Sequence, residues 1–357
     1  MRLSLTMIVK NEEDVLARAL STAAVYADEI VIVDTGSTDK TAEIARRFTD
    51  KVFSFPWVDD FSAARNYAVA KSTGDYWIWL DADDVVTLEC ARKILKIKDA
   101  LDGKTDIIML PYVLDRDETG RPLFSYYRER IIRRAPQFMW KGRVHEAIEL
   151  KGTVVKKAPY ILHAKPSERT SGTRNLDIYK KMAAEGEVFT PRDYYYYARE
   201  LFYSGDMSAA EKAFRKFIDL PGGFSVNKVD ACIMLSRCYV KLGDTLSAKR
   251  ALFESFTFGI PTGEACCEIG IRFLSENDYP SAIYWFKRAH SVKPDIKSGA
   301  FIDTDCYGFI PFVWLTVCYD RLGDIENAYR YHLRAKKLRP DHPSVINNDR
   351  YFSGILK

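Results

Sequence analysis

Two aspartates at the end of an apolar run are the residues of this sequence best suited to chemistry. Asp81 and Asp83 follow the run at 76–80 and stand two positions apart, so both side chains leave the same face of an extended backbone. Two carboxylates directed at one point repel each other unless a cation lies between them. Oxygen ligands at a sheet edge suit Mg²⁺ or Mn²⁺, with a substrate phosphate completing the coordination. The alternative is an acidic loop in which Asp84 caps a helix that begins near Thr87.

The elements around these aspartates predict a sheet whose strand ends form a site. Short apolar runs alternate with helical patterns over the first hundred residues, which predicts βαβ units and a largely parallel sheet. The expected strands are 3–9, 29–34, 51–55 and 76–80, and the expected helices are about 13–22, one from Asp39, and 60–71. Ligands of such sheets bind at the carboxyl ends of the strands. The polar clusters 34–37 and 81–84 fall at those ends.

Beyond the parallel part, the pattern changes twice. From about 106 to 163, strand-like stretches without intervening helices predict an antiparallel addition to the first domain. Residues 164–192 predict a loop and a bridging helix. The expected domains are therefore 1–165, a linker with a helix over 166–192, and a third region over 193–357.

The third region is predicted to be helical and repetitive. Four segments share a helix, a break and then a small residue, and the alanines among them are Ala210, Ala248, Ala282 and Ala328. The breaks fall at Gly205, Gly243, Asn277 and Gly323. This pattern resembles the tetratricopeptide repeat, in which the small residue lets two helices approach closely and glycine supplies a left-handed turn. Residues 295–310 are expected to be an insertion between the third and fourth repeats.

Composition excludes several classes of protein. A net charge of +4 on 357 residues provides no basic footprint for nucleic-acid binding. The seven cysteines show no zinc spacing and fall mostly inside helical patterns, so we expect reduced thiols in a cytoplasmic protein. No apolar stretch approaches the roughly 20 residues needed to span a membrane.

Four segments together resemble one family. The segments 8–13, 33–41, 64–84 and 144–146 resemble glycosyltransferase family 2 in order and spacing, over roughly residues 1–165. Within that family, the bacterial peptide S-glycosyltransferases of the glycocin type and the lipopolysaccharide-core glucosyltransferases are the most similar. The resemblance implies an α/β GT-A domain with a Rossmann-like mixed sheet, followed by an all-α tetratricopeptide-like domain.

The resemblance also implies a set of site residues for a UDP-hexose donor. The nucleotide sugar would meet Val9, Glu12, Asp34, Arg65, Asp81 and Ala82. The metal, Mg²⁺ or Mn²⁺, would be held by Asp83 and Asp81, with His163 as a further ligand. Glu146 would deprotonate the acceptor, and His145 would orient Glu146 or pack beneath the site. Trp140 and Tyr194 are the candidates for contact with the acceptor.

Simpler roles remain open for some of these residues. Asp34 could cap the turn that precedes the next helix, and Arg65 could be a solvated helix residue. Trp77 and Trp79 alternate with apolar neighbours on a central strand, which predicts that both lie in the core.

The leading hypothesis is an inverting, metal-dependent glycosyltransferase that moves a hexose from a UDP-sugar to a peptide or protein side chain, Cys or Ser. The peptide acceptor follows from the repeats, since stacked helical hairpins form a concave groove. The same repeats could drive homodimerisation, which leaves a lipopolysaccharide or other glycan acceptor open. A hypothesis of another class is a tetratricopeptide scaffold with an inactive transferase domain. Glycoside hydrolysis is disfavoured, because Asp81 and Asp83 are too close in sequence to flank a sugar.

Overall fold

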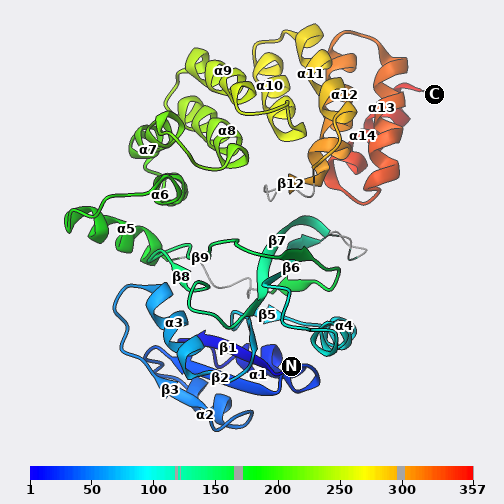
Figure 1. The fold of residues 1–357 in the computed structure, drawn as a ribbon. Helices are drawn as coiled ribbons and strands as arrows, with labels where there is room; N and C mark the ends of the chain where they lie inside the picture. The colour runs from blue at the N-terminus through cyan, green and yellow to red at the C-terminus, as the bar shows by residue number, and fades with distance from the viewer. Residues whose placement is uncertain (117–119, 121, 165–171, 296–301, 357) are drawn as a thin grey trace. The chain divides into compact units, whose positions relative to one another are not determined.

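The chain divides into two compact units, each with its own core. The computed structural model describes residues 1–116, 120, 122–164, 172–295 and 302–356. The units are Met1–Val188 and Phe189–Lys357 (Figure 1).

A mixed sheet forms the centre of the first unit. Its parallel part contains β3 (Val52–Ser54), β2 (Glu29–Asp34), β1 (Leu3–Val9) and β4 (Tyr76–Trp79), in that order. The sheet continues through β7 (Pro122–Arg133), β6 (Ile107–Arg116), β11 (Ile161–His163) and β5 (Asp84–Val85), and β10 (Val154–Lys156) also pairs with β6. The expected parallel βαβ part is therefore confirmed.

The second half of the sheet is only partly antiparallel. β7 runs antiparallel to β4 and to β6, as predicted. β10 and β11 instead run parallel to β6. β7 ends beside Asp106 and β10 begins opposite Ile107, which is the same end of β6. β10 therefore runs antiparallel to β7 and parallel to β6.

Helices cover both faces of this sheet. The apolar sides of α1 (Leu16–Leu20), α2 (Thr41–Arg46) and α4 (Leu88–Asp99) belong to one core cluster with β1 and β4. On the other face, α3 (Phe61–Lys71) and the small β8–β9 pair (Trp140–Lys141, Ala147–Ile148) share a second cluster with Trp77 and Trp79. These two tryptophans are 1% and 2% exposed, which confirms that they are core residues. The predicted bridging helix is α5 (Arg174–Ala184), which belongs to the first unit.

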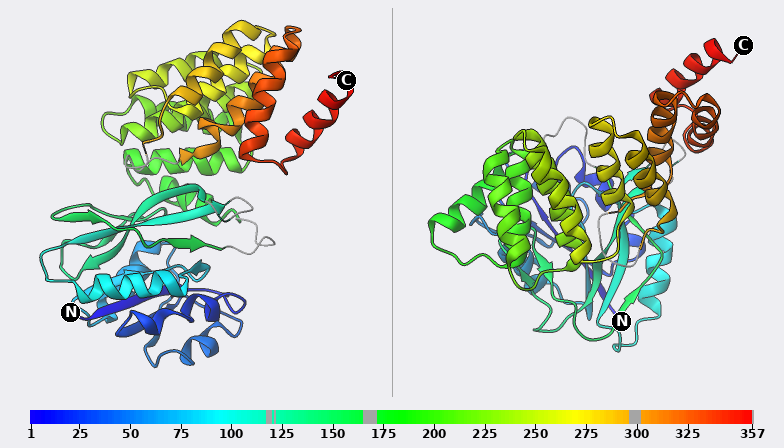
Figure 2. Two further views of the ribbon diagram at one scale, coloured as in Figure 1. Left: turned by 90° about the vertical axis from the view of Figure 1, so that its right-hand side faces the viewer. Right: turned by 90° about the horizontal axis from the view of Figure 1, so that it is seen from above.

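The second unit is a series of helical hairpins, in which consecutive helices pack side by side (Figure 2). The hairpins are α6–α7 (Pro191–Tyr203, Met207–Asp219), α8–α9 (Ser225–Lys241, Thr245–Glu254), α10–α11 (Gly263–Ser275, Tyr279–Ser291) and α12–α13 (Phe309–Arg321, Ile325–Leu338), followed by α14 (Pro343–Ile355). The four repeat alanines have no exposed surface, as their role at the helix crossings requires. This confirms the tetratricopeptide-like fold.

Each predicted break adopts the left-handed turn. Gly205, Gly243 and Gly323 have φ of 89°, 84° and 76°, and Asn277 takes the same conformation with φ 61°. Asparagine tolerates this region better than other residues with side chains, which explains how one repeat dispenses with glycine. The insertion expected over 295–310 contains β12 (Ile302–Asp303) and a short 3₁₀ turn (Thr304–Tyr307), while 296–301 lie outside the described residues.

All seven cysteines are free and buried, as the sequence predicted. Among the residues described, the structure contains no helix with the length and apolar character needed to cross a membrane.

Candidate active site

A cavity of about 340 Å³ lies in the first unit, at the carboxyl ends of β1 and β4. This is the edge at which the sequence placed its polar clusters. The predicted site residues that line it are Val9, Glu12, Arg65, Asp81, Ala82, Asp83, His145 and Glu146. The sheet and its loops therefore bring together residues that are separated by more than a hundred positions in the chain.

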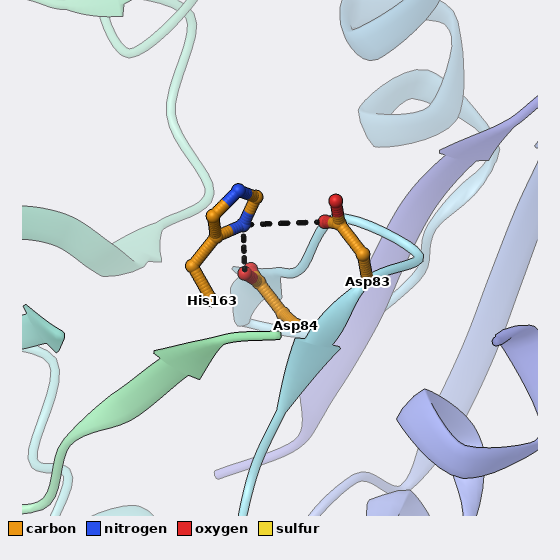
Figure 3. A group of neighbouring side chains, drawn as sticks. All are labelled: Asp83, Asp84 and His163. Atoms are coloured by element: carbon orange, nitrogen blue, oxygen red, sulfur yellow. Dashed lines mark ion pairs between the residues drawn. The ribbon is translucent and has the colours of Figure 1, made fainter. Parts of the chain in front are cut away.

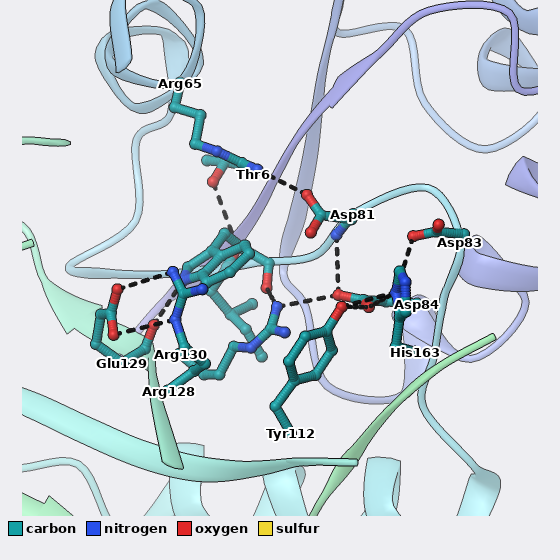
Figure 4. Close-up of polar contacts among 12 residues, drawn as sticks. Thr6, Arg65, Asp81, Asp83, Asp84, Tyr112, Arg128, Glu129, Arg130 and His163 are labelled. Atoms are coloured by element: carbon teal, nitrogen blue, oxygen red, sulfur yellow. Dashed lines mark hydrogen bonds and ion pairs between the residues drawn. The ribbon is translucent and has the colours of Figure 1, made fainter. Parts of the chain in front are cut away.

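Arg65 joins the two sides of this cavity. Its guanidinium donates from Nη2 to Asp81 Oδ1 at 2.7 Å and from Nε to Glu146 Oε1 at 2.5 Å. Figure 4 shows the Arg65 side chain directed at Asp81. Burial alone would lower the pKa of Arg65, but the charges of Asp81 and Glu146 outweigh it and raise the pKa. Arg65 is therefore a buried bridging cation, and the interpretation as a solvated helix residue is wrong.

The aspartates at the end of β4 point to different partners. Strand β4 ends at Trp79, and residues 82–83 form a turn, so strand alternation no longer applies there. Asp81 pairs with Arg65, whereas Asp83 faces His163 (Figure 4). The expectation that Asp81 and Asp83 leave the same face is therefore corrected.

Asp83, Asp84 and His163 form a cluster that could hold a metal ion. Their possible ligand atoms all lie within 4.8 Å of one another. Nδ1 of His163 is 3.4 Å from Asp83 Oδ1 and 3.8 Å from Asp84 Oδ1, and Figure 3 shows both carboxylates directed at the imidazole. Antiparallel pairing of β11 with β5 places His163 directly opposite Asp84. Hydrogen bonds with Asp83 and then Asp84 raise the pKa of His163 to about 10, so this position favours a positive charge.

Asp84 has a structural role in this cluster. It is fully buried and accepts hydrogen bonds from Arg130 Nη1 at 3.0 Å, from the Tyr112 hydroxyl at 2.8 Å and from the Asp81 backbone N–H at 3.0 Å. Thr87, and not Asp84, caps α4, because the Thr87 hydroxyl accepts from the Cys90 backbone N–H. The capping interpretation of Asp84 is therefore wrong. Asp83 and His163 are the more exposed members of the cluster.

The loop that carries His145 and Glu146 has an unusual backbone. His145 has φ 49°, a left-handed conformation that is uncommon for residues other than glycine and concentrates at functional sites. Its ring stacks on Tyr179 of α5, with centroids 6.4 Å apart. Glu146 is 9% exposed and is held by Arg65. The Phe61 backbone N–H donates to the Arg143 carbonyl, which ties this loop to α3.

Four predicted site residues lie outside the lining of the cavity: Asp34, Trp140, His163 and Tyr194. Asp34 Oδ1 accepts from the backbone N–H groups of Gly36 and Ser37, so it does cap its turn. His163 stands behind Asp83, and Tyr194 is on α6 of the second unit, where it packs against Phe189.

Trp140 corrects another expectation. It is 3% exposed and packs edge to face on Trp79, with centroids 5.0 Å apart. The Arg65 guanidinium lies 5.1 Å from its ring centroid. Trp140 is therefore buried behind Trp79 and Arg65 and does not line the cavity.

Sequence reasoning missed several residues that line the cavity: Lys10, Trp57, Phe61, Arg128, Arg174 and Asn175. One feature of the sequence could have indicated Arg128. Arg128 and Arg130 alternate in an otherwise strand-like segment, and two arginines on one face of a strand require anionic or aromatic partners there.

Comparison with known proteins agrees with this geometry. Residues 4–149 match the family model described as Glycosyl transferase family 2. The first unit holds a family 2 glycosyltransferase domain. The matched range includes β4, all of β1 except its first residue, and every carboxylate that lines the cavity.

Curated relatives are similar over this domain. A TPR repeat-containing protein of Synechococcus elongatus is 35% identical over 149 residues, which cover 42% of this chain and 36% of the relative. The SPbeta prophage-derived glycosyltransferase SunS of Bacillus subtilis is 32% identical over 143 residues, which cover 39% of this chain and 33% of the relative. The chain thus spans about a third of the length of these relatives.

Solved structures align with the helical part of the fold at low similarity. YrrB, described as a TPR protein with an unusual peptide-binding site, aligns over 50% of this chain and 82% of its own, with 20% identity and a TM-score of 0.38. MamA aligns over 46% of this chain and 80% of its own, with 16% identity and a TM-score of 0.36. The tetratricopeptide-like fold of the second unit is therefore assigned from its helical hairpins and not from these similarities.

Proposed function

We propose that this chain is a metal-dependent, inverting glycosyltransferase that moves a hexose from a UDP-sugar to an acceptor. The observation that carries the proposal is the arrangement around Arg65 within a family 2 domain. One buried guanidinium joins Asp81 to Glu146, and Asp83 and His163 stand beside Asp81 at the same strand ends. A transferase needs both a cationic environment for a departing diphosphate and a base for the acceptor.

The donor side of the site is the cluster at Asp83. Carboxylate oxygens suit Mg²⁺ or Mn²⁺, and the raised pKa of His163 indicates that Asp83 and Asp84 favour a positive charge at this position. Asp83 and His163 would hold the ion, and Asp81 would contact the nucleotide. When bound, the ion would supply positive charge to the departing diphosphate.

The acceptor side of the site is the Glu146 loop. Arg65 fixes Glu146 through Oε1, and the second oxygen of the same carboxylate remains to accept the proton of the acceptor. Phe61 and Arg174 also line the cavity. The Arg174 guanidinium lies 4.7 Å from the Phe61 ring centroid. A base separate from the metal-binding carboxylates supports a single displacement with inversion.

A peptide or protein side chain, Cys or Ser, is the acceptor that we favour. The second unit consists of tetratricopeptide-like hairpins, and this architecture binds extended chains in its concave surface. A lipopolysaccharide or other glycan acceptor is the alternative, with the hairpins serving dimerisation. An acceptor screen with peptides and oligosaccharides, read by mass spectrometry, separates the two.

Titration of UDP with and without Mn²⁺ tests the proposal. We expect Mn²⁺-dependent binding in the parent protein, its loss in Asp83→Asn, and unchanged binding with lost sugar transfer in Glu146→Gln. Asp50→Asn, at an exposed position outside the cavity, is the matched control. Absence of metal-dependent UDP binding in the parent protein would favour the inactive scaffold instead.

A further inference from the structure

Three neighbouring strands bring Tyr112, His163 and Asp84 to one face of the sheet. β11 lies between β6 and β5, and Ile161 of β11 pairs with Tyr112 of β6. On its other side, His163 of β11 pairs with Asp84 of β5. Paired residues of neighbouring strands share a face, and so do residues two apart on one strand, such as Ile161 and His163. The register therefore gathers these three side chains, and Figure 4 shows the hydrogen bonds between them.

The Tyr112 hydroxyl lies between a carboxylate and an imidazole. It donates to Asp84 Oδ1 at 2.8 Å, and its oxygen is also 2.8 Å from His163 Nδ1. Tyr112 is 6% exposed, and the Arg130 guanidinium lies 4.4 Å from its ring centroid. The hydroxyl therefore belongs to an enclosed ring whose polar end meets both of its neighbours.

The donors and acceptors around this hydroxyl determine which nitrogen of His163 carries a proton. Asp84 pairs with the Arg130 guanidinium, so it is a carboxylate that can only accept hydrogen bonds. A tyrosine hydroxyl has one hydrogen, which Asp84 receives, and the oxygen is then left to accept. His163 therefore donates from Nδ1–H, and Nε2 is the ring nitrogen that can present a lone pair to an ion.

Asp84 is occupied on both carboxylate oxygens. Oδ1 accepts from Tyr112, and Oδ2 accepts at 3.0 Å from Arg130 Nη1 and at 3.0 Å from the Asp81 backbone N–H. Asp84 is 0% exposed, whereas the His163 side chain is 30% exposed. Asp84 therefore holds Tyr112 in place, and His163 is the accessible end of this chain of hydrogen bonds.

We propose that Tyr112 is a positioning residue that presents Nε2 of His163 to the metal ion. This proposal rests on the proposed function. An imidazole that binds a metal donates its other ring N–H to a fixed acceptor, which sets both the tautomer and the orientation of the ring. Here the acceptor is the Tyr112 hydroxyl, which Asp84 holds in turn.

Tyr112→Phe removes the hydroxyl and tests this role through the affinity for Mn²⁺ in the presence of UDP, measured from the electron paramagnetic resonance of free Mn²⁺. We expect this affinity to fall roughly tenfold to a hundredfold, because a group that orients a metal ligand is lost. The matched control is Tyr76→Phe. Tyr76 is buried in the same sheet, and its hydroxyl donates to the Thr105 carbonyl at 2.5 Å and not to a residue of the site. This variant should bind Mn²⁺ as the parent does, and an unchanged Mn²⁺ affinity in Tyr112→Phe would overturn the proposal.

The double variant with His163→Ala separates an effect through the imidazole from an effect through Asp84. If Tyr112 acts through His163, Tyr112→Phe should lower the Mn²⁺ affinity of the parent protein and cause no further loss in the His163→Ala background. Equal losses in the two backgrounds would mean that the substitution acts through Asp84 and the turn at 81–84. That result would overturn the proposal while leaving the proposed function in place.

Nitrogen NMR of the histidine rings provides a measurement that does not depend on affinity. Zn²⁺ is diamagnetic and binds imidazole, so it replaces Mn²⁺ here, and the signals that disappear in His163→Ala identify the ring. We expect Nδ1 to retain its proton and Nε2 to bind the ion. Ligation through Nδ1, or through neither nitrogen, would overturn the proposal. A parent protein without metal-dependent UDP binding would overturn both this proposal and the proposed function.

Discussion

Glu29 offers a quantitative test of how the central strands are held. Glu29 is 8% exposed, and its carboxylate accepts hydrogen bonds from Ser4 of β1, from Lys51 before β3 and from the Thr73 backbone before β4. Burial alone would raise the pKa of Glu29, but these hydrogen bonds outweigh it and lower the pKa from 4.5 to about 2. A depression of this size corresponds to about 3 kcal/mol of stability at neutral pH.

The contribution of Glu29 to stability falls in acid because the pKa of Glu29 is lower in the folded state. A carboxylate whose folded pKa is depressed contributes its stability above the unfolded pKa, and this contribution is lost as the pH falls from about 4.5 toward about 2. Glu29→Gln should therefore cost about 3 kcal/mol at neutral pH and progressively less in acid. Urea unfolding followed by tryptophan fluorescence measures this difference in the first unit, which holds four of the six tryptophans.

Glu89→Gln provides the control for this series. Glu89 pairs with Lys93 on the surface of α4, and its side chain is 75% exposed. Solvent screens such an exposed pair, so this variant should unfold like the parent protein at every pH. A gap between Glu29→Gln and the parent that stayed constant from neutral pH to pH 3 would refute the reasoning, because no differential protonation would then exist.

Substitutions at three further positions test other parts of the fold. Asp84→Asn should cost the first unit about 3–5 kcal/mol, since it leaves the buried Arg130 charge without its carboxylate; urea unfolding measures this loss, and a cost below about 1 kcal/mol would contradict it. Ala248→Leu should overpack the second hairpin by about 1–3 kcal/mol in thermal unfolding without changing UDP titration. Asn277→Ala should destabilise the second unit by about 1 kcal/mol because φ there is 61°, whereas Asn277→Gly should not; equal melting temperatures of the two variants would exclude this explanation.

The helical repeats could be predicted because their signals are local. A small residue such as Ala282 and a break such as Gly243 stand within a few positions of the contacts they create. The parallel strands were also predictable, since β1 and β4 are short apolar runs that precede polar clusters. Both signals depend on chain neighbours, so one sequence suffices to detect them.

The site itself depends on contacts between residues far apart in the chain. Arg65 meets Asp81 and Glu146, which lie 16 and 81 positions away, and neither spacing is a helical or strand period. Local reasoning therefore made Arg65 a solvated residue or a ligand contact. It also made Asp84 a helix cap, because its partner Arg130 is 46 positions distant. Trp140 illustrates the same limit, since the proximity of an aromatic residue to a motif does not reveal whether it lies above or below the site.

Because the donor side and the acceptor side of this site share the Arg65 guanidinium, a substitution on one side also affects the other. Removal of the carboxylate at position 81 or at position 146 leaves the Arg65 guanidinium with one carboxylate partner in place of two, so the guanidinium can shift toward the partner that remains. Losses of turnover from the two single changes will therefore not sum in the double variant. Kinetic effects at either position have to be interpreted through a double-mutant cycle before a role is assigned to one side chain.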